Sequence, residues 1–482
     1  MELFLTTAVD PIGGNLLSAS ESGNTPSVKS PFSIRNVRSF IAFRVFFNSR
    51  FYYPVFTILF LDFGLTLDQF ALLNAAWAAA IVLLEVPSGA LADTIGRRKL
   101  LVLTGVLMVV EIALLCFVPL GNASLLFAVF IVNRVLSGAA EAAASGADEA
   151  IAYDSLKKEG DVRDWPRVLE KQMRMQSIAY IGAMSLGAAV YDPALMQRLM
   201  NFLGLDVNLT QNITLRFPLY LTFIMAIMTL LITLRMEEDP SPTEPECQPE
   251  DNCTPTIWQA FKLTLQAGGW ILKTPFALVI ILAGLMFDNC IRMVVTLGSQ
   301  YYRLISLPEA SFGLIGSGLA ILGLIIPRLA YKMANRHTPT YNLGVMTAVC
   351  MLGLIGMTFF FPIIGLLPVA LLVVVMYMGR FFQSHYLNRI TASHQRATVL
   401  SFKGLSFNLA YGVIGVLYAL LLATLRPQIA VSQPDLGRIA LENMVFIKSI
   451  SWFPWYFLLT LAVLLVVARR QLKKTDVHKK VG

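Results

Sequence analysis

Ionisable and amide side chains stand inside the long apolar stretches of this 482-residue sequence. If these stretches cross a membrane, such groups are costly, and they usually pair and face a cavity along the path of an ion or solute. We predict a cluster at the membrane midplane that lines such a path. Its members are Arg50, Glu111, Arg134 and Asp288, with Asn48 and Asn408 at similar depth.

A second layer of charges is expected closer to one membrane face. The depths follow from a helical rise of about 1.5 Å per residue, and the members of this lower layer are Arg44, Glu85, Glu141 and Arg380. We expect Arg44 to hold Glu85 or Glu141, either as a clamp between helices or as part of the path. The pKa of a carboxyl group rises when a closing cavity removes water from it, and falls when an arginine lies beside it. Alternating exposure could therefore couple a proton to solute movement.

The arginines of the midplane cluster suit an anionic or zwitterionic solute, unless the carboxylates beside them neutralise their charge. No particular solute is specified by the sequence, and the oligomeric state is also left open.

Composition identifies the elements that must position these side chains. Hydrophobic residues make up 56% of the chain and charged residues 14%, against about 45–50% and about 25% in soluble domains. A spanning helix needs about 20 mainly apolar residues. Twelve runs reach this length, so we predict an all-α membrane protein with twelve transmembrane helices embedded in a lipid bilayer. Their approximate limits are 38–62, 68–92, 99–120, 124–149, 169–192, 213–235, 274–298, 308–332, 342–361, 363–386, 398–425 and 445–469.

One long polar connector divides the twelve runs into six and six. Residues 237–256 read EEDPSPTEPECQPEDNCTPT, and this proline and acid content favours a flexible link over a packed segment. We therefore expect two six-helix bundles with a linker between them and a tail at each end. The boundaries are 1–37 for the first tail, 38–235 for the first bundle, 236–273 for the linker, 274–469 for the second bundle and 470–482 for the last tail.

Lysines and arginines predict the orientation, because cytoplasmic loops of membrane proteins carry an excess of them. An even number of helices places both tails on one side, and that side receives most of the basic residues, including the final ARRQLKKTDVHKK. Both termini are therefore expected in the cytoplasm, with the chain in the inner or plasma membrane of the cell. The net charge of +8 is explained by this placement, so nucleic acid is not an expected partner.

No cofactor and no metal are expected. Cys116, Cys290 and Cys350 lie inside apolar runs, and Cys247 and Cys253 lack a common zinc-binding spacing. A phosphate-binding Gly-x-x-x-x-Gly-Lys loop does not occur, so ATP is not expected to drive the protein directly.

A motif between the second and third predicted helices indicates a family. It reads Gly89-Ala-Leu-Ala-Asp93-Thr-Ile-Gly96-Arg97-Arg98-Lys99, where Gly96 permits a tight turn and the basic triplet holds the loop in the cytoplasm. This motif resembles the cytoplasmic signature of the major facilitator superfamily. Arg134 followed by Gly138 on the fourth helix is similar to a second feature of that superfamily. The stretch from Ser145 to Leu156 resembles a bacterial branch of efflux and general transporters.

The resemblance implies the major facilitator fold, in which two bundles rock about a central site. It implies a secondary active transporter of a small organic solute, with protons as the expected coupling ion and export favoured. Two departures from the family pattern matter: the first counts against a proton–drug antiporter, and the second indicates that the loop motif is present in one half only. The fifth helix lacks a glycine–proline pair, and the loop from Tyr331 to Arg336 lacks the aspartate and glycine of a second motif.

Two alternatives from other classes remain. One is a sensor or partner protein that uses a transporter scaffold without moving a solute. The other is a polytopic membrane enzyme, which would need a nucleophile, a metal or a histidine base at a membrane face. Its candidates would be His385 and His394, and no residues with triad-like spacing accompany them.

Overall fold

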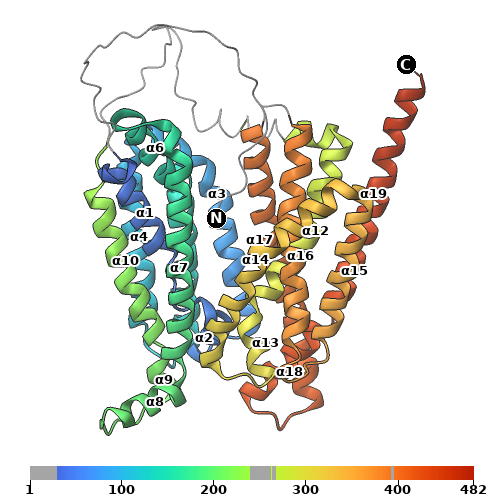
Figure 1. The fold of residues 1–482 in the computed structure, drawn as a ribbon. Coiled ribbons are helices and arrows are strands. Elements are labelled where there is room, and N and C mark those ends of the chain that lie inside the picture. The colour runs from blue at the N-terminus through green and yellow to red at the C-terminus, as the bar shows by residue number, and fades with distance from the viewer. Residues whose placement is uncertain (1–29, 239–261, 263–267, 392–395, 482) are drawn as a thin grey trace, which may run out of the picture.

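The computed structural model describes residues 30–238, 262, 268–391 and 396–481, and all regular structure in these ranges is helical. The helices before the linker form the N-terminal bundle, and those after it form the C-terminal bundle (Figure 1). The N-terminal bundle contains α1 (Arg35–Asn48), α2 (Phe56–Phe63), α3 (Leu67–Ile95), α4 (Arg97–Phe117), α5 (Ala123–Ala144), α6 (Ala147–Glu159), α7 (Trp165–Tyr191), α8 (Pro193–Phe202), α9 (Gln211–Thr214) and α10 (Phe217–Arg235). The C-terminal bundle contains α12 (Pro275–Thr296), α13 (Gly298–Leu304), α14 (Phe312–Arg336), α15 (Pro339–Met357), α16 (Leu366–Ile390), α17 (Arg396–Ser432), α18 (Arg438–Ile450) and α19 (Phe453–Val481).

Within the described ranges, 10 helices are long and apolar enough to cross a membrane, and α7 with α8 makes an eleventh if that bent pair is one span. Helices α1 and α2 occupy the first predicted span. The all-α fold with twelve helical passages is thereby confirmed. A turn separates the ninth and tenth predicted spans, because α15 ends at Met357 and α16 begins at Leu366.

The prediction of one continuous helix over 38–62 is wrong. The chain leaves the helix after Asn48 and passes through a 3-10 turn at Tyr53–Val55 before α2 begins. Pro54 explains the break, since proline lacks an N–H and its ring clashes with the carbonyl four residues earlier. The interruption places Arg50 in a bend of the backbone, where its side chain can turn into the bundle.

The fourth predicted span, 124–149, is also divided. Helix α5 ends at Ala144, and Gly146 takes a left-handed conformation with φ of 78° before α6 begins. Glycine adopts this conformation without the steric penalty of a Cβ. The change of direction brings the first turn of α6, with Asp148 and Glu149, towards α1.

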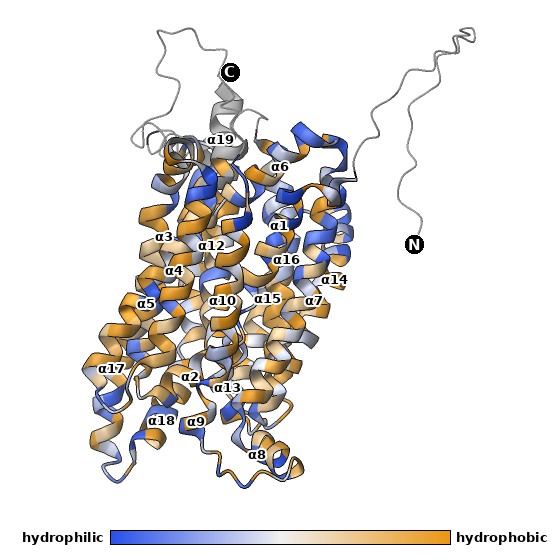
Figure 2. Ribbon diagram, turned by 90° about the vertical axis from the view of Figure 1, so that its left-hand side faces the viewer, coloured by the Kyte–Doolittle hydropathy of each residue, from blue (hydrophilic) through white to orange (hydrophobic). Residues whose placement is uncertain are grey.

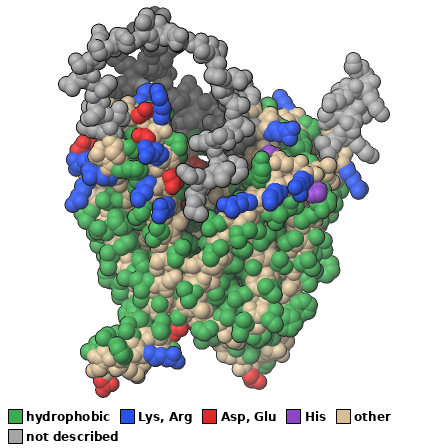
Figure 3. Space-filling view, in the orientation of Figure 1, with side chains coloured by type: hydrophobic (Ala, Val, Ile, Leu, Met, Phe, Trp, Pro, Cys, Tyr) green, Lys and Arg blue, Asp and Glu red, His purple; other side chains and the backbone are tan. Residues whose placement is uncertain are grey.

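Polar and apolar surfaces are arranged as a membrane protein requires. Lys and Arg side chains gather over the end of the molecule where α6 lies, hereafter the α6 end, while hydrophobic side chains cover the middle (Figures 2 and 3). The opposite end, where α2, α13 and α18 lie, is called the α18 end (Figure 1). Helix α8 departs from the axis of α7 by 82° and lies beside the bundle at the α18 end.

Small residues let the two bundles meet closely along α3 and α17. Ala71, Ala75 and Ala78 of α3 face Gly412 and Gly415 of α17, and a Cβ on Gly415 would lie 3.1 Å from the Ala71 carbonyl oxygen. Close approach of this kind is how helices associate in a bilayer, where apolar side chains alone give little driving force.

A second close contact joins α7 to α14. A Cβ placed on Gly313 would lie only 2.0 Å from the carbonyl oxygen of Met184. No other residue fits there without moving one bundle relative to the other, so Gly313 fixes how closely the bundles approach near the α18 end.

Candidate transport site

A cavity of about 420 Å³ lies between the bundles, in the half of the molecule nearer the α6 end. Helices α1, α3, α5 and α6 supply most of its wall, and Asn408 of α17 contributes from the other bundle. Its charged lining consists of Arg44, Glu85, Glu141, Asp148 and Glu149, and its aromatic lining consists of Phe43, Phe47 and Trp77. The lower layer predicted from the sequence therefore lines this cavity, apart from Arg380.

The predicted clamp of Arg44 on Glu85 or Glu141 is wrong. Arg44 instead pairs with two carboxylates at the start of α6, donating from Nη2 to Asp148 Oδ1 and to Glu149 Oε1, each at 3.0 Å. Both carboxylates belong to the first turn of α6, which packs against α1. Position along the helix did not predict the direction in which Arg44 points.

Glu85 and Glu141 consequently face the cavity without an ion-pair partner among the described residues. The Glu85 Oε2 atom is buried and receives no hydrogen bond from the part of the chain that the structure describes. Around the cavity, four carboxylates thus accompany one arginine that is already paired twice. An excess of unpaired carboxylates attracts positive charge, so this lining does not favour the anionic solute suggested by the arginines in the sequence.

The predicted midplane cluster separates into two parts. In the N-terminal bundle, Arg50 forms an ion pair with Glu111, and their side chains are 4% and 0% exposed. Asn133 supports this pair by donating to the Glu111 carbonyl oxygen at 2.8 Å. The pair therefore lies in the core of one bundle and does not line the large cavity.

Arg134 lies in the same core, 5% exposed, with its guanidinium 5.3 Å from the centre of the Phe56 ring. Its Nε and Nη1 atoms are buried and have no acceptor in the described part of the chain. A cation over an aromatic face is partly stabilised by the ring. Glu111 is paired with Arg50, and Arg134 is stabilised by the Phe56 ring.

Asp288 belongs to the other bundle, away from Glu111. It pairs with Arg292 one turn along α12, at 2.6 Å. Arg292 in turn donates to Asn408 Oδ1 at 3.2 Å and lies 5.1 Å from the centre of the Tyr411 ring. Arg380 of α16 shares a small cavity of about 30 Å³ with Asp288 and Arg292. The i, i+4 spacing of Asp288 and Arg292 on one helix was the sequence signal that could have predicted this pair.

Of the predicted amide residues, Asn48 lines the cavity and donates from Nδ2 to the Arg44 carbonyl oxygen at 2.7 Å. It therefore fixes the end of α1, while Asn408 links the cavity to Arg292.

The loop motif lies at the α6 end, where Gly89 belongs to α3 and Gly96 has a positive φ of 98° between α3 and α4. Arg97 forms an ion pair with Asp154 of α6, and Arg98 donates to the Leu234 carbonyl oxygen at 3.2 Å. The side chain of Asp93 lies outside the described part of the structure. The basic residues of the motif thus tie α4 to α6 and α10 within one bundle.

Sequence analysis missed a set of polar contacts that join the bundles at the α18 end. Asp62 of α2 accepts two hydrogen bonds from Arg303 of α13, at 2.9 and 2.7 Å, and one from the Tyr191 hydroxyl at 2.5 Å. Burial alone would lower the pKa of Arg303, but its hydrogen bonds to Asp62 and the charge of that carboxylate raise the pKa above its usual range. Arg303 therefore stays charged at any physiological pH. We call Asp62, Tyr191 and Arg303 the α18-end gate.

A second contact at this end supports the gate. Arg426 of α17 pairs with Asp68 of α3 and with Glu442 of α18, and Glu442 also accepts from the Leu67 N–H at 3.2 Å. Among the residues that the structure describes, every ion pair between the bundles lies at this end. These residues stand at helix ends, where polar side chains are ordinarily solvated and carry no distinctive signal in the sequence.

Comparison with known proteins identifies the same architecture. The family model described as Major Facilitator Superfamily matches residues 39–415. A bacterial homologue of the human lysosomal transporter Spinster, in an inward-facing and unoccupied conformation, superposes with a TM-score of 0.67 at 12% identity, covering 94% of this chain and 99% of that one. The nucleoside transporter NupG gives 0.65 at 14% identity over 91% and 99%, and a D-xylose–proton symporter gives 0.55 at 13% over 88% and 97%. No curated protein matches the sequence.

Proposed function

This chain belongs to the Major Facilitator Superfamily, and from that premise we propose a proton-coupled secondary transporter that exports a small, positively charged organic solute by alternating access. It is a multi-pass membrane protein that transports solutes, not an enzyme. The coupling ion, the direction and the charge of the solute are our proposals. The observation that carries them is a cavity whose carboxylates Glu85 and Glu141 have no ion-pair partner among the described residues, beside two bundles that ion pairs join at the α18 end.

The conformation supports alternating access. The two bundles are tied by the α18-end gate and by Arg426, whereas the cavity lies nearer the α6 end. Basic side chains gather over the α6 end (Figure 3), which favours the cytoplasm for that side and for both termini. On this orientation the structure is an inward-facing state, as is the Spinster homologue that it resembles.

Glu85 and Glu141 are the groups we assign to coupling. Both face the cavity and have no cationic partner among the residues described, so each can exchange a proton for a positively charged group of the solute. Closure of the cavity would remove water from these carboxylates and favour the protonated or solute-bound form. Trp77 and Phe47, which share the wall, offer aromatic faces to an organic cation.

The test is mass spectrometry of cells and medium for cells that produce the wild-type chain, Glu141→Gln or no transporter. We expect organic cations to be depleted from cells with the wild-type chain and enriched in their medium, and the difference to be lost with Glu141→Gln. Glu170→Gln, at an exposed position of α7, is the matched control and should behave as the wild type.

The other outcomes decide among the alternatives. Accumulation inside the cells that produce the wild-type chain would overturn export, and a change confined to organic anions would overturn the proposed charge. Equal export by the wild type and Glu141→Gln at every external pH would remove Glu141 from coupling. No change in any solute would favour the sensor on a transporter scaffold.

A further inference from the structure

Helix α8 exposes a row of large apolar side chains. Leu195, Leu199 and Phe202 stand at positions i, i+4 and i+7, which share one face of a helix, and they are 39%, 45% and 86% exposed. On the opposite face, Gln197 donates from Nε2 to the Val207 carbonyl oxygen at 2.8 Å and so holds the returning chain. Exposed apolar side chains that lie together mark an interaction site, so this face calls for a partner.

The end of α7 places this face at a membrane surface. Residues 175–191 of α7 carry no charge and rise about 25 Å, close to the hydrocarbon thickness of about 30 Å. Helix α7 therefore crosses the bilayer without α8, which departs from its axis by 82° and lies at the α18 end (Figure 1). The axis of α8 thus runs along the membrane surface, as interfacial helices do.

The bilayer is the partner that fits this face. Ile181 and Leu186 of α7 are 46% and 48% exposed, so lipid already covers the helix from which α8 departs. Residues 193–210 carry one basic and one acidic side chain, Arg198 and Asp206, whose charges cancel. Attraction to anionic lipids is therefore small, and insertion of the apolar side chains provides the binding energy.

Asp192 connects α8 to the α18-end gate. Its Oδ1 caps the helix by accepting from the Leu195 N–H at 3.1 Å, and its Oδ2 accepts from the Ala310 N–H of the C-terminal bundle at 3.2 Å. Tyr191, the preceding residue, donates to Asp62 within the gate. Over its 10 residues α8 extends about 15 Å, so a tilt of α7 moves the far end of α8 relative to the membrane surface.

We propose that α8 docks on the bilayer at the α18 end, with Leu195, Leu199 and Phe202 inserted between lipid headgroups, and that this docking stabilises the closed gate. A docked α8 resists the tilt of α7 that would separate Tyr191 and Asp192 from their partners. The inference goes beyond solute transport, since it requires neither a particular solute nor a direction.

The docking is tested with single spin labels at Leu199→Cys and Asn201→Cys, on opposite faces of α8, after Cys247 and Cys253 are replaced with serine. The full-length protein is placed in phosphatidylcholine nanodiscs. Oxygen, which concentrates in the bilayer, should relax the label at position 199 more than a water-soluble nickel chelate does, and the label at position 201 should show the reverse. Exchange of half the lipid for phosphatidylglycerol should change neither result, because the charges of the segment cancel.

The effect on the gate is measured by double electron–electron resonance between Ser124→Cys and Gln433→Cys, exposed positions of opposite bundles that lie outside α8. Leu199→Gln combined with Phe202→Gln should add a population with a longer distance between the labels, and Phe202→Gln alone should add a smaller one. Asp206→Asn, at an exposed position of the returning chain, is the matched control and should leave the distances unchanged.

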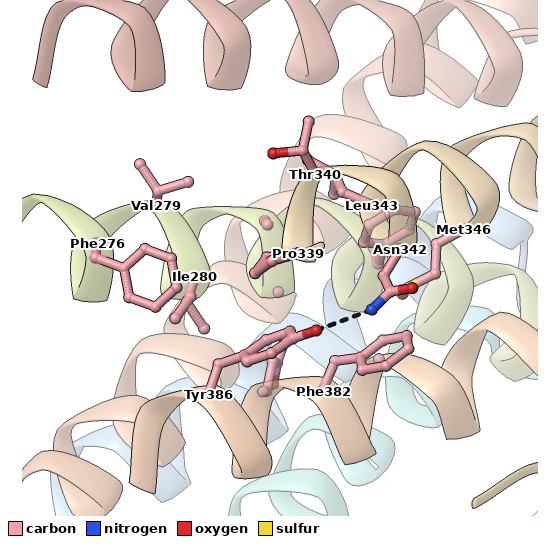
Figure 4. A pocket seen from close by; sticks show the side chains of 15 residues that line it. Phe276, Val279, Ile280, Pro339, Thr340, Asn342, Leu343, Met346, Phe382 and Tyr386 are labelled. Carbon is pink, nitrogen blue, oxygen red and sulfur yellow. Dashed lines mark hydrogen bonds between the residues drawn. The ribbon is translucent and has the colours of Figure 1, made fainter. Parts of the chain in front are cut away.

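A second apolar space gives the competing explanation for a lipid effect. A cavity of about 140 Å³ lies inside the C-terminal bundle between α12, α15 and α16, and in its wall Asn342 donates to the Tyr386 hydroxyl at 2.9 Å (Figure 4). Ala283→Phe reduces this cavity from α12. A longer distance in Ala283→Phe together with unchanged distances in the α8 variants would move the lipid effect to the cavity and overturn the role of α8.

Each remaining outcome overturns one part of the inference. Equal exposure of both labels to the nickel chelate would show that α8 lies in water. Protection of position 199 from oxygen and from the chelate would show that a protein, such as a second copy of this chain, covers the face. A docked α8 with unchanged distances in the double variant would remove its hold on the gate. A failure of the proposed transport would alter none of these readings, so the two failures can be told apart.

Discussion

Replacing Asp62 with asparagine should open the α18 end of the molecule. Asp62 accepts two hydrogen bonds from Arg303 and one from Tyr191, so it joins α2 to α13 and α7. Asparagine retains one oxygen acceptor but loses the charge and one of the two Arg303 acceptors. The perturbation therefore weakens the gate with little change in side-chain volume.

The magnitude follows from the geometry. A hydrogen bond to a charged group contributes about 1.5–3 kcal/mol, and the side chains of Arg303 and Asp62 are 27% and 18% exposed. Partial solvent exposure reduces the value, so we expect a loss of about 1.5–2 kcal/mol. Since 1.4 kcal/mol corresponds to a factor of ten in an equilibrium constant, the equilibrium should shift by about tenfold to thirtyfold away from the gated state.

The assay is double electron–electron resonance between spin labels at Asn208→Cys and Gln433→Cys, two exposed positions at the α18 end of opposite bundles. Cys247 and Cys253 would first be replaced with serine. Asp62→Asn should add a population with a longer distance between the labels. Asp435→Asn, at an exposed position of the same end, removes a charge without touching the gate and should leave the distances unchanged. Identical distance distributions for Asp62→Asn and its parent would refute the assignment of Asp62 as a lock.

Two further substitutions test the packing of the bundles and the buried ion pair. In Gly313→Leu the new side chain would meet the Met184 carbonyl, since even a Cβ would lie 2.0 Å from that oxygen. The same spin labels should therefore report a longer distance. An unchanged distance would show that α14 has room to adjust. Glu111→Gln leaves Arg50 with its charge uncompensated in the core, which should lower stability by about 3–5 kcal/mol and reduce the melting temperature in detergent. The double variant with Arg50→Met should recover part of that loss, and a double variant no more stable than Glu111→Gln would contradict the pairing.

The sequence predicts the spanning helices and their division into two bundles, because both depend on the order and length of apolar and polar segments along the chain. Apolar length alone marks a spanning helix, and the acidic, proline-rich connector marks the division into bundles. The interruption at Pro54 was also visible as a residue type, but the surrounding apolar run concealed it. The predicted helix 124–149 runs past the observed end of α5 at Ala144 for a similar reason. Counting apolar residues does not detect the left-handed conformation of Gly146.

The candidate site was less predictable because depth along a helix does not give direction around it. Arg44 was expected to hold Glu85 or Glu141, yet it pairs with Asp148. Asp288 was assigned to a cluster with Glu111, although the two belong to different bundles and each has an arginine of its own. Which residues face one another across the bundles depends on tertiary packing, which no local pattern in the sequence records.

The distribution of paired charges supports Glu85 and Glu141 as the coupling groups of the proposed mechanism. Arg50–Glu111 and Asp288–Arg292 each pair within one bundle, so both pairs can survive when the bundles rock as rigid bodies. Asp62–Arg303 and Asp68–Arg426 join the bundles at the α18 end, where water can replace a partner when that end opens. Glu85 and Glu141 remain, because they face the 420 Å³ cavity and form neither kind of ion pair with the residues that the structure describes. Their hydration must change between the two states, so protons and solute should compete for these carboxylates and not for Glu111.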